Sequence, residues 1–500
     1  MKLGRGIVVI LLMTCCSQAA LGLFDQIESR QSIGEHVAHN KGLVENFPDG
    51  GTDCLSQSNY SSGMSFPEVD GCWHYRSRYI VGELLWVPAG IIGVDYPSMK
   101  IFSLLVALTE IVLIFSFISK YFGRIEGQKA ALAYSTVPAF IYYAQAPFIG
   151  HFRVIAVLLI ARFAIPHFSR DSSEEEELGG VWKFAAWALV VIGPGIDSLL
   201  AFAWAGFGLS LIILNTRGRK VSINAILAFF SSPVLWFIIS NKVNDMFGYN
   251  NELSARFEAR TDFSLFMDSD YYVAFLDSFT NQAGPLGLVL LILLFSDLKR
   301  YYDAGPEVFS AVVSLSSMLF FTLFVFQSTF IDCCPYFAYP VVALCSFGMA
   351  GFKLDARKNV LILSILLFTS FSSGLLLHSV ENNYSERELQ RYVIDNIDEE
   401  DGMVITDHNI ARWNAYRWQI PGGTIHISED YSAEEFKQLV VSAQPEHIIL
   451  SNQSFHEVNA SILESEGYCV TEIETDERIP PHWIDGWMSD VYPIRGIWRC

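Results

Sequence analysis

The sequence predicts an α-helical polytopic membrane protein with about eleven transmembrane helices and a small C-terminal α/β domain outside the cytoplasm. The 500-residue chain is 51% hydrophobic and 17% charged, with a mean hydropathy of +0.32, which leaves too little polar surface for a soluble protein of this length. Apolar runs long enough to cross a bilayer recur along residues 1–380. From residue 381 onward, short alternating strand and helix patterns replace them.

The first apolar run follows Lys2 and Arg5 and continues to Phe24. A cleaved signal peptide and a first transmembrane span both fit a positively charged start followed by an apolar stretch. The stretch CCSQAALG has small residues but no clean cleavage site, and the run is long enough to cross a bilayer. We therefore interpret it as the first span.

Ten further apolar runs are predicted spans: 101–119, 130–147, 149–168, 181–196, 198–214, 221–240, 283–297, 308–328, 335–352 and 359–379. One more run, 79–94, is ambiguous because it is short and contains Glu83 and Pro88. If 79–94 lies flat at the bilayer surface, four basic loops fall on the same side as the N-terminus. These loops carry Lys120/Arg124/Lys129, Arg217/Arg219/Lys220, Lys299/Arg300 and Lys353/Arg357/Lys358.

The positive-inside rule selects this arrangement, because a crossing at 79–94 would put every later basic loop outside. The N-terminus is then cytoplasmic. Three extracytoplasmic pieces follow: a large first outer loop at 25–97, a middle outer loop at 241–282 and a C-terminal domain at 381–500. The membrane itself is either the cell membrane or the endoplasmic reticulum.

Cysteines and charge agree with this arrangement. Cys54 and Cys72 share the first outer loop, and Cys469 and Cys500 share the tail, so each pair could form a disulfide in an oxidising compartment. A net charge of −20 argues against nucleic acid as a partner, because phosphates need a basic surface.

The C-terminal domain shows strand patterns at 403–407, 447–452 and 469–474, with helix patterns at 432–444 and 454–467 between them. Such alternation predicts a small α/β layer with a parallel sheet.

Two carboxylates stand where the first span ends. Asp25 and Glu28 are three residues apart and would share one face of a helix. A carboxylate at a water–lipid boundary can act as a general base, although acids are also common in plain solvated helix ends.

Basic residues are the second group of candidates. His74, Arg76 and Arg78 precede the 79–94 segment, where they could hold a lipid phosphate or anchor the chain to head groups. His151 and Arg153 fall at the outer end of a predicted hairpin, and ionisable groups at that depth are functional candidates.

The first 200 residues resemble the GT-C superfamily of polytopic membrane glycosyltransferases, particularly the dolichyl-phosphate-mannose–protein mannosyltransferase-like group (glycosyltransferase family 39-like). One span is followed by an acid and the helix ESRQSIGEHVAHNKGL, and then by a long outer loop that leads into GIIGVDYPSMKIFSLLVALTEIVLIFSFISKYFG. GQKAALAYSTVPAFIYYAQAPF and CPYFAYPVVALCSFGMAGF are similar to a family span with a tyrosine-rich edge and to its late Tyr–Pro span.

The resemblance implies that Asp25 is the catalytic acid of the first outer loop. Many members have a second acid directly after it, where this chain has Gln26, so that role would pass to Glu28 or fail. Cys334 and Pro335 precede Tyr336 where the family has a basic residue. Phosphate binding is therefore expected from Arg153 and His151, with Arg76 or Arg78, while His74 and Tyr336 are candidates for acceptor or sugar contact.

The implied activity is inverting transfer of a mannose-like hexose from a polyprenyl- or dolichyl-phosphate donor to a protein, lipid or glycan acceptor. Membrane lipids are further expected partners. No cofactor is required, because the cations can stabilise the phosphate charge, and a divalent metal remains compatible. The alternatives are a transporter or lipid flippase, and a non-catalytic membrane scaffold with a partner-binding outer domain.

Overall fold

The computed structural model describes residues 5–24, 80–93, 96–147, 149–169, 180–197, 199–246, 269–325, 339–351 and 357–380, together with five strands and short pieces near them after residue 403. The chain divides into two compact units. The first, which we call the helical unit, comprises Met1–Gly22, Arg78–Leu85 and Ser103–Leu377. The second comprises Leu23–Ser77, Trp86–Phe102 and His378–Cys500.

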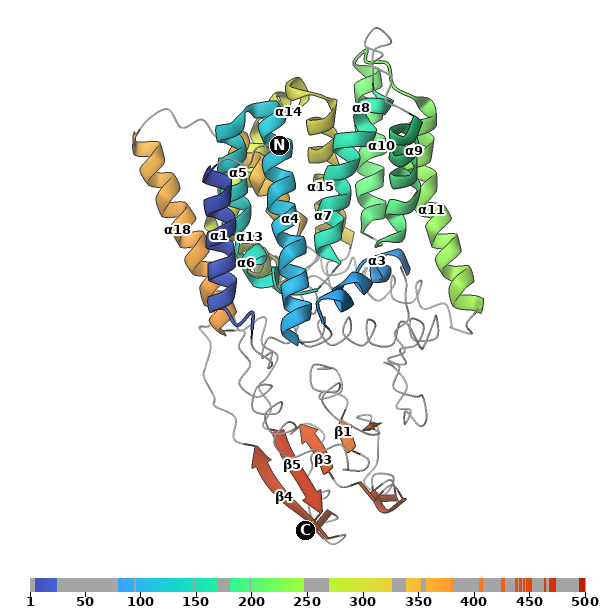
Figure 1. The fold of residues 1–500 in the computed structure, drawn as a ribbon, viewed down its shortest axis with the longest axis vertical. Helices are drawn as coiled ribbons and strands as arrows, with labels where there is room; N and C mark the ends of the chain where they lie inside the picture. Colours follow the sequence, from blue (N-terminus) through green and yellow to red (C-terminus); the bar gives the residue numbers. More distant parts are fainter. Residues whose placement is uncertain are drawn as a thin grey trace. The chain divides into compact units, whose positions relative to one another are not determined.

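The helices in chain order are α1 (Arg5–Ala20), α3 (Ile80–Leu84), α4 (Tyr96–Phe122), α5 (Arg124–Thr136), α6 (Pro138–Tyr143), α7 (Gly150–Leu159), α8 (Ile165–Phe168), α9 (Gly180–Ile192), α10 (Leu200–Thr216), α11 (Ile223–Met246), α13 (Ser269–Ser296), α14 (Leu298–Ala304), α15 (Pro306–Val325), α17 (Pro340–Gly351) and α18 (Arg357–Val380). Short 3-10 segments occur at η2 (Val87–Ile91) and η4 (Gly193–Gly195), and a π-helical turn, η3 (Ile160–Ala164), joins α7 to α8. In Figure 1 the long helices of the helical unit run roughly along one direction.

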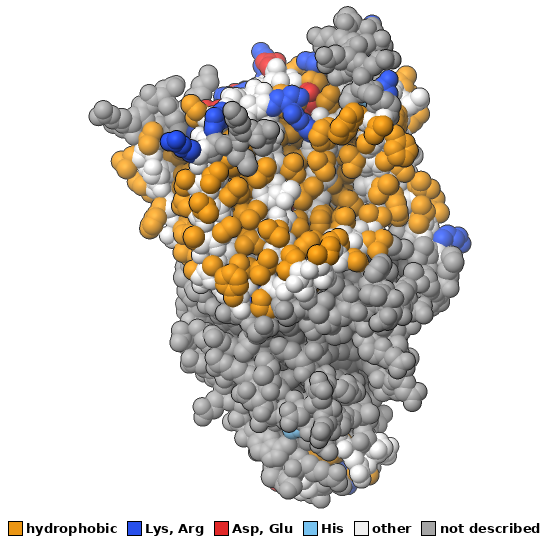
Figure 2. All heavy atoms as spheres, viewed as in Figure 1, with side chains coloured by type: hydrophobic (Ala, Val, Ile, Leu, Met, Phe, Trp, Pro, Cys, Tyr) orange, Lys and Arg blue, Asp and Glu red, His pale blue; other side chains and the backbone are white. Residues whose placement is uncertain are grey.

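Apolar helices occur at each of the predicted runs. Within the described residues, three stretches are long and apolar enough to cross a membrane alone: Pro97–Phe122, Gly150–Phe168 and Ile223–Ser240. A fourth is added if the bent pair Gln282–Ser296 and Leu298–Ala304 counts as one span. Hydrophobic side chains cover the visible face of these helices (Figure 2), as expected of an integral membrane protein. The count of eleven crossings stays a prediction.

Two expected spans differ in detail from single straight helices. The run at 130–147 is split at Val137, whose backbone is extended (φ −65°, ψ 133°) because the following Pro138 disfavours the helical conformation. The run at 283–297 is preceded by a further helical stretch that starts at Ser269, and α13 is kinked at Gly284 (φ 69°) directly before Pro285.

The ambiguous segment 79–94 forms two short pieces, α3 and η2, of five residues each. A five-residue α-helix is about 7.5 Å long, far less than the roughly 30 Å of a bilayer core, so neither piece can cross a membrane. Its position at the bilayer surface stays a prediction.

Helix α17 forms the centre of the helical unit. All its residues from Pro340 to Ala350 are buried, and it packs against α5, α7, α13 and α15. A helix that is apolar on every side is typical of such a buried position. At Gly348 a Cβ would lie 2.2 Å from the carbonyl oxygen of Leu290, so the close packing of α17 on α13 requires glycine.

The described basic loop residues come together at one end of the helical unit (Figure 2). Lys120 at the end of α4 pairs with Glu307 at 3.7 Å. Arg217 after α10 stacks over the ring of Tyr302, and Arg300 stacks over Phe122. The shared end agrees with the positive-inside analysis. Which side of the membrane it faces stays a prediction.

The second unit contains a five-stranded sheet of order β2-β1-β3-β5-β4. The strands are β1 (Val404–Asp407), β2 (Thr424–Ile427), β3 (His447–Ser451), β4 (Tyr468–Ile473) and β5 (Ile494–Arg499). Strands β2, β1 and β3 are parallel, whereas β5 is antiparallel to both β3 and β4. The expected parallel pairing is confirmed for the strands at 403–407 and 447–452, which correspond to β1 and β3. It is wrong for the strand at 469–474, because the C-terminal strand β5 inserts between β3 and β4 and is antiparallel to both. The helices predicted at 432–444 and 454–467 lie mostly outside the described residues, so the α/β character of the domain stays a prediction.

Candidate functional site

A cluster of buried polar side chains lies inside the helical unit, centred on Glu110. This residue is near the middle of α4, about 20 Å from either end of the helix, and has no exposed surface. A buried carboxylate is costly unless it is paired and hydrogen-bonded, so its partners define the site.

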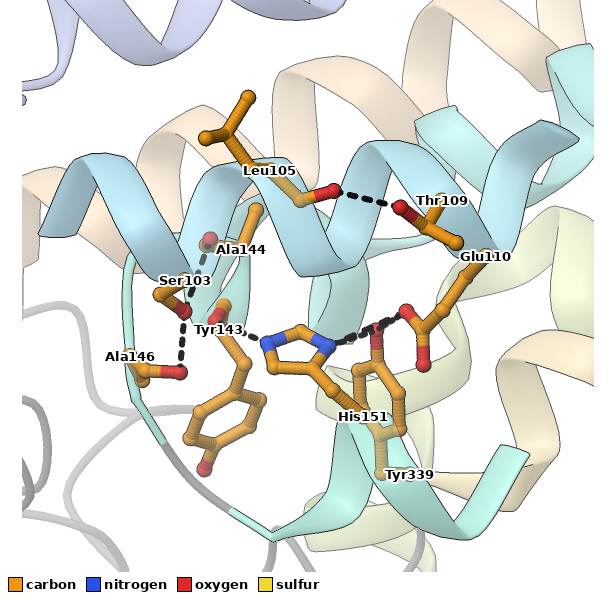
Figure 3. A network of polar contacts seen from close by, with 9 residues as sticks. All are labelled: Ser103, Leu105, Thr109, Glu110, Tyr143, Ala144, Ala146, His151 and Tyr339. Carbon is orange, nitrogen blue, oxygen red and sulfur yellow. Dashed lines mark hydrogen bonds and ion pairs between the residues drawn. The ribbon is translucent and has the colours of Figure 1, made fainter. Parts of the chain in front are cut away.

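His151 and Tyr339 supply those partners (Figure 3). Glu110 Oε2 lies 3.1 Å from His151 Nδ1, and the Tyr339 hydroxyl donates to the same oxygen at 2.9 Å. Tyr339 directly precedes α17, while His151 lies in the first turn of α7. Tyr134 of α5 is also close enough to interact electrostatically with Glu110. Four helices therefore meet around one carboxylate.

The turn between α6 and α7, residues 144–149, is held by side chains from other helices. His151 Nε2 lies 3.1 Å from the carbonyl oxygen of Tyr143. The hydroxyl of Ser103, in α4, donates to the carbonyl oxygens of Ala146 at 2.6 Å and Ala144 at 3.3 Å (Figure 3). Buried backbone carbonyls need such partners, since no regular helix bond is available in the turn.

The same turn is tied to the end of α1. The side-chain amide of Gln145 donates to the carbonyl oxygen of Gln18 at 2.8 Å and to that of Leu21 at 3.4 Å. In return, the amide of Gln18 donates to the carbonyl oxygen of Ile141 at 2.9 Å. The Gln18 and Leu21 carbonyl oxygens lie in the last turn of α1 and just beyond it, where carbonyl groups have no partner in a continuing helix. The Gln18 oxygen also accepts from the Leu21 N–H group at 3.2 Å.

Arg153 is 1% exposed and ion-pairs through Nε with the carboxylate of Asp197. Asp197 follows η4, in the turn between α9 and α10. Gly82 of α3 packs against this turn and the one before α7, because a Cβ there would lie 2.2 Å from the carbonyl oxygen of Ile196 and 2.6 Å from Ile149. The segment α3 thus contacts the turn that carries Asp197 and the turn that leads into α7, the helix of Arg153.

Of the residues predicted from the sequence, the structure brings His151 and Arg153 into this cluster. The hairpin is present, and residues 144–147 at its end are buried. The other predicted site residues lie outside the described residues: Asp25, Glu28, His74, Arg76, Arg78, Tyr336, Cys54, Cys72 and Cys500. The backbone of Cys469 lies in β4.

Sequence reasoning missed the roles of Glu110, Asp197, Tyr339, Gln145 and Gln18. A signal existed for two of them, because Glu110 is a lone carboxylate within an apolar run and Asp197 is an acid in the short turn GPGID. Among the described residues, no group of three or more His, Cys, Asp and Glu side chains could hold a metal ion.

No protein-family model matches the sequence, and a comparison with curated proteins likewise finds no match. Solved structures do match. ArnT from Cupriavidus metallidurans, bound to undecaprenyl phosphate, aligns over 98% of this chain and 97% of its own, with a TM-score of 0.50 and 12% identity. The Archaeoglobus fulgidus oligosaccharyltransferase, in complex with Zn and sulfate, aligns over 88% of this chain and 68% of its own, with a TM-score of 0.51 and 12% identity.

The chain has a GT-C fold. The resemblance found in the sequence is confirmed at the level of fold, which by itself leaves the reaction open. Within this GT-C fold, the described polar cluster lies where α1, α4, α6, α7 and α17 meet. Its carboxylate–imidazole–phenol network lies on one side of α7, and the buried guanidinium of Arg153 leaves α7 on the other side, toward Asp197. Such groups can hold a proton and an anion, respectively.

Proposed function

We propose that the protein is a membrane glycosyltransferase. It moves a mannose-like hexose from a polyprenyl- or dolichyl-phosphate donor to a protein, lipid or glycan acceptor on the extracytoplasmic face, with inversion at the anomeric carbon. Asp25 is the proposed general base, and Arg153 is the proposed partner of the donor phosphate.

One observation supports this pairing most directly: Gln145 binds the end of α1 to the turn that leads to Arg153. The chain reaches Asp25 four residues after Leu21. The segment that leads to the proposed base and the turn that leads to the proposed phosphate ligand are therefore fastened together by hydrogen bonds.

The charges of Arg153 and Asp197 support a need for a further cation at the donor phosphate. Arg153 and Asp197 together are formally neutral, and an anion gains little from a neutral pair in a low-dielectric setting. A guanidinium has five N–H donors, and the Asp197 contact through Nε uses one of them. Arg76 or Arg78 would supply the additional positive charge.

The donor class is supported by the ArnT structure, which carries undecaprenyl phosphate. A donor of this kind stays in the bilayer through its lipid tail, so its reacting carbon must be reached at the membrane boundary. The mannose-like sugar and the dolichyl variant rest on the sequence resemblance.

The reaction balances without a co-reactant. Asp25 takes the proton of the acceptor hydroxyl as its oxygen bonds to the anomeric carbon. The bond from that carbon to the phosphate oxygen breaks, and the electron pair leaves with the lipid phosphate, where Arg153 stabilises the charge. Glu28 is the proposed second acid, in place of one at Gln26.

Reconstituted full-length protein tests the proposal with a polyprenyl-phosphate donor that carries a labelled hexose. Asp25→Asn keeps the size of the side chain but removes the base, so transfer should fall by about 10²–10⁴-fold. Glu28→Gln tests the proposed second acid and should cost less. Full transfer by Asp25→Asn would show that the base is assigned wrongly.

A lipid flippase or transporter is the second candidate, because Glu110, His151, Arg153 and Asp197 are ionisable groups buried among apolar helices. The same vesicles separate the two functions. A flippase would move the labelled donor between leaflets without forming a glycosylated acceptor, whereas a transferase forms the product and free polyprenyl phosphate.

A further inference from the structure

The buried pair Glu110 and His151 contains one shared proton. The Tyr143 carbonyl oxygen can only accept a hydrogen bond, so His151 Nε2 must carry a proton. His151 Nδ1 faces a carboxylate oxygen at 3.1 Å, so a proton lies on Nδ1 or on Glu110. In both forms the pair is neutral overall, as its burial requires.

This arrangement fixes the imidazole from three directions. Nε2 is held by the Tyr143 carbonyl oxygen, Nδ1 by Glu110, and the ring packs edge-on against Tyr339 with centroids 5.3 Å apart. Since His151 is in the first turn of α7, a fixed ring also fixes the rotation of that turn about the helix axis.

Arg153 follows His151 by two residues on the same helix. At 3.6 residues per turn, two residues are separated by about 200°, so the two side chains leave α7 on opposite sides. His151 faces Glu110 and Tyr339, and Arg153 faces Asp197. A rotation or shift of the first turn that freed His151 would carry the guanidinium away from its present place.

We propose that Glu110 and His151 are positioning residues, which hold the first turn of α7 so that Arg153 stays aligned for the phosphate of the lipid donor. The inference rests on the proposed function. Its basis is the hydrogen-bond network Glu110–His151–Tyr143 and the placement of Arg153 on the opposite side of the same helical turn.

A Glu110 that only forms hydrogen bonds and a Glu110 that carries a proton require different side-chain chemistry. In Glu110→Gln one amide hydrogen can be donated to Nδ1 and the other to the Tyr339 hydroxyl oxygen, which then accepts instead of donating, while Nε2 still donates to Tyr143. The ring therefore stays held although the pair has lost its exchangeable proton. A positioning role therefore tolerates Glu110→Gln, and a proton-carrying role does not.

A double-mutant cycle on purified full-length protein tests the proposal, with polyprenyl phosphate as the probe and labelled-sugar transfer measured in parallel. Arg153→Gln should weaken binding by about tenfold, the loss expected for a charge-assisted hydrogen bond. His151→Ala should weaken it to a similar extent. His151→Ala combined with Arg153→Gln should be no weaker than Arg153→Gln alone, because positioning matters only when the guanidinium is present.

Two further variants keep the test decisive if His151→Ala fails to fold. Tyr339→Phe removes the hydroxyl that binds Glu110 and should weaken binding in the same Arg153-dependent way. Tyr301→Phe is its matched control, because the Tyr301 hydroxyl is also buried and donates to the Phe347 carbonyl oxygen at 2.9 Å, in a contact that involves neither α6 nor α7. It should lower thermal stability similarly and leave binding unchanged.

The results of these measurements distinguish a failure of the positioning role from a failure of the proposed function. Three results would each overturn the positioning role while leaving the proposed function in place. The first is an equal fold-loss of binding for His151→Ala, or for Tyr339→Phe, with and without Arg153. The second is unchanged binding in Tyr339→Phe, and the third is a loss of transfer in Glu110→Gln with binding intact. If folded wild-type protein neither binds polyprenyl phosphate nor transfers sugar, the proposed function falls, and this inference falls with it.

Discussion

Arg153 and Asp197, 44 residues apart in the chain, form a buried ion pair between α7 and the turn before α10. Their side chains are 2% and 10% exposed, so neither charge is well solvated. Removal of one charge from such a pair leaves the other uncompensated, whereas removal of both takes away attraction and desolvation cost together.

Asp197→Asn is therefore expected to lower the free energy of unfolding by about 3–5 kcal/mol, because the Arg153 charge stays buried after its ion pair with this carboxylate is lost. Arg153→Gln should act similarly. The double variant should cost clearly less than the sum of the two. Thermal unfolding in detergent measures all three, with Ser210→Ala, which removes a buried hydrogen bond to Ser310, as the reference for an ordinary polar loss. Additive losses would contradict the ion-pair assignment.

Gln145→Leu tests the connection to α1. The substitution keeps most of the side-chain volume but removes both hydrogen bonds to the Gln18 and Leu21 carbonyl oxygens. We expect a loss of stability of about 0.5–1.5 kcal/mol, the usual net contribution of a hydrogen bond, because the Gln18 carbonyl oxygen keeps its bond from the Leu21 N–H group and the bond to the Leu21 carbonyl oxygen is only part-buried. Transfer activity should fall further than in a control of equal stability, such as Ser210→Ala, since the end of α1 leads to Asp25. If Gln145→Leu and Ser210→Ala were equally stable and equally active, the contact between Gln145 and α1 would have no role in transfer.

Most of the helical unit could be predicted from the sequence, because uninterrupted apolar runs leave few alternatives to helices in a membrane. The breaks within these helices were harder to predict from the sequence. The split at Val137 depends on Pro138 and the kink at Gly284 on Pro285, yet both prolines lie inside runs whose average hydropathy shows one continuous segment. In the sheet, β5 lies between two strands that precede it in sequence, an order that no local pattern contains.

Two of the buried polar residues described above could be predicted from the sequence, and the roles of five others could not. His151 and Arg153 stood out because ionisable residues at the end of a predicted hairpin are costly. Tyr339 lies 188 residues from His151, and its ring alone resembles any other aromatic residue of an apolar span. Asp197 reveals its role only through the distant Arg153. Partner choice across helices depends on packing, which local periodicity does not encode.

Gly82→Ala tests whether α3 must stay close to the turn that carries Asp197 and to the turn before α7. The added Cβ would lie 2.2 Å from the Ile196 carbonyl oxygen, which is backbone and cannot rotate away. We expect α3 to shift and donor binding to weaken severalfold. Gly218→Ala provides a comparison at a glycine with no neighbour within 4 Å, whose φ of +88° makes the substitution strained without crowding. We expect both variants to lose stability. Only Gly82→Ala should also bind the donor more weakly.

The membrane orientation is open to a direct test with single introduced cysteines. Ile125, in the first turn of α5 beside the basic loops, is 72% exposed, and Ile91, in η2, is 89% exposed. The positive-inside rule puts Ile125 in the cytoplasm and the 25–97 loop outside. In intact cells that carry the protein in the cell membrane, a membrane-impermeant maleimide should therefore label Ile91→Cys and spare Ile125→Cys, and permeabilisation should make Ile125→Cys reactive.

The parent chain, with its nine native cysteines, sets the background for both measurements. A membrane-permeant maleimide should label both variants and so prove that each site is accessible. The reverse pattern, with Ile125→Cys labelled from outside, would place the basic end outside the cytoplasm. Asp25 would then lie on the cytoplasmic side, where the proposed transfer on the extracytoplasmic face could not occur.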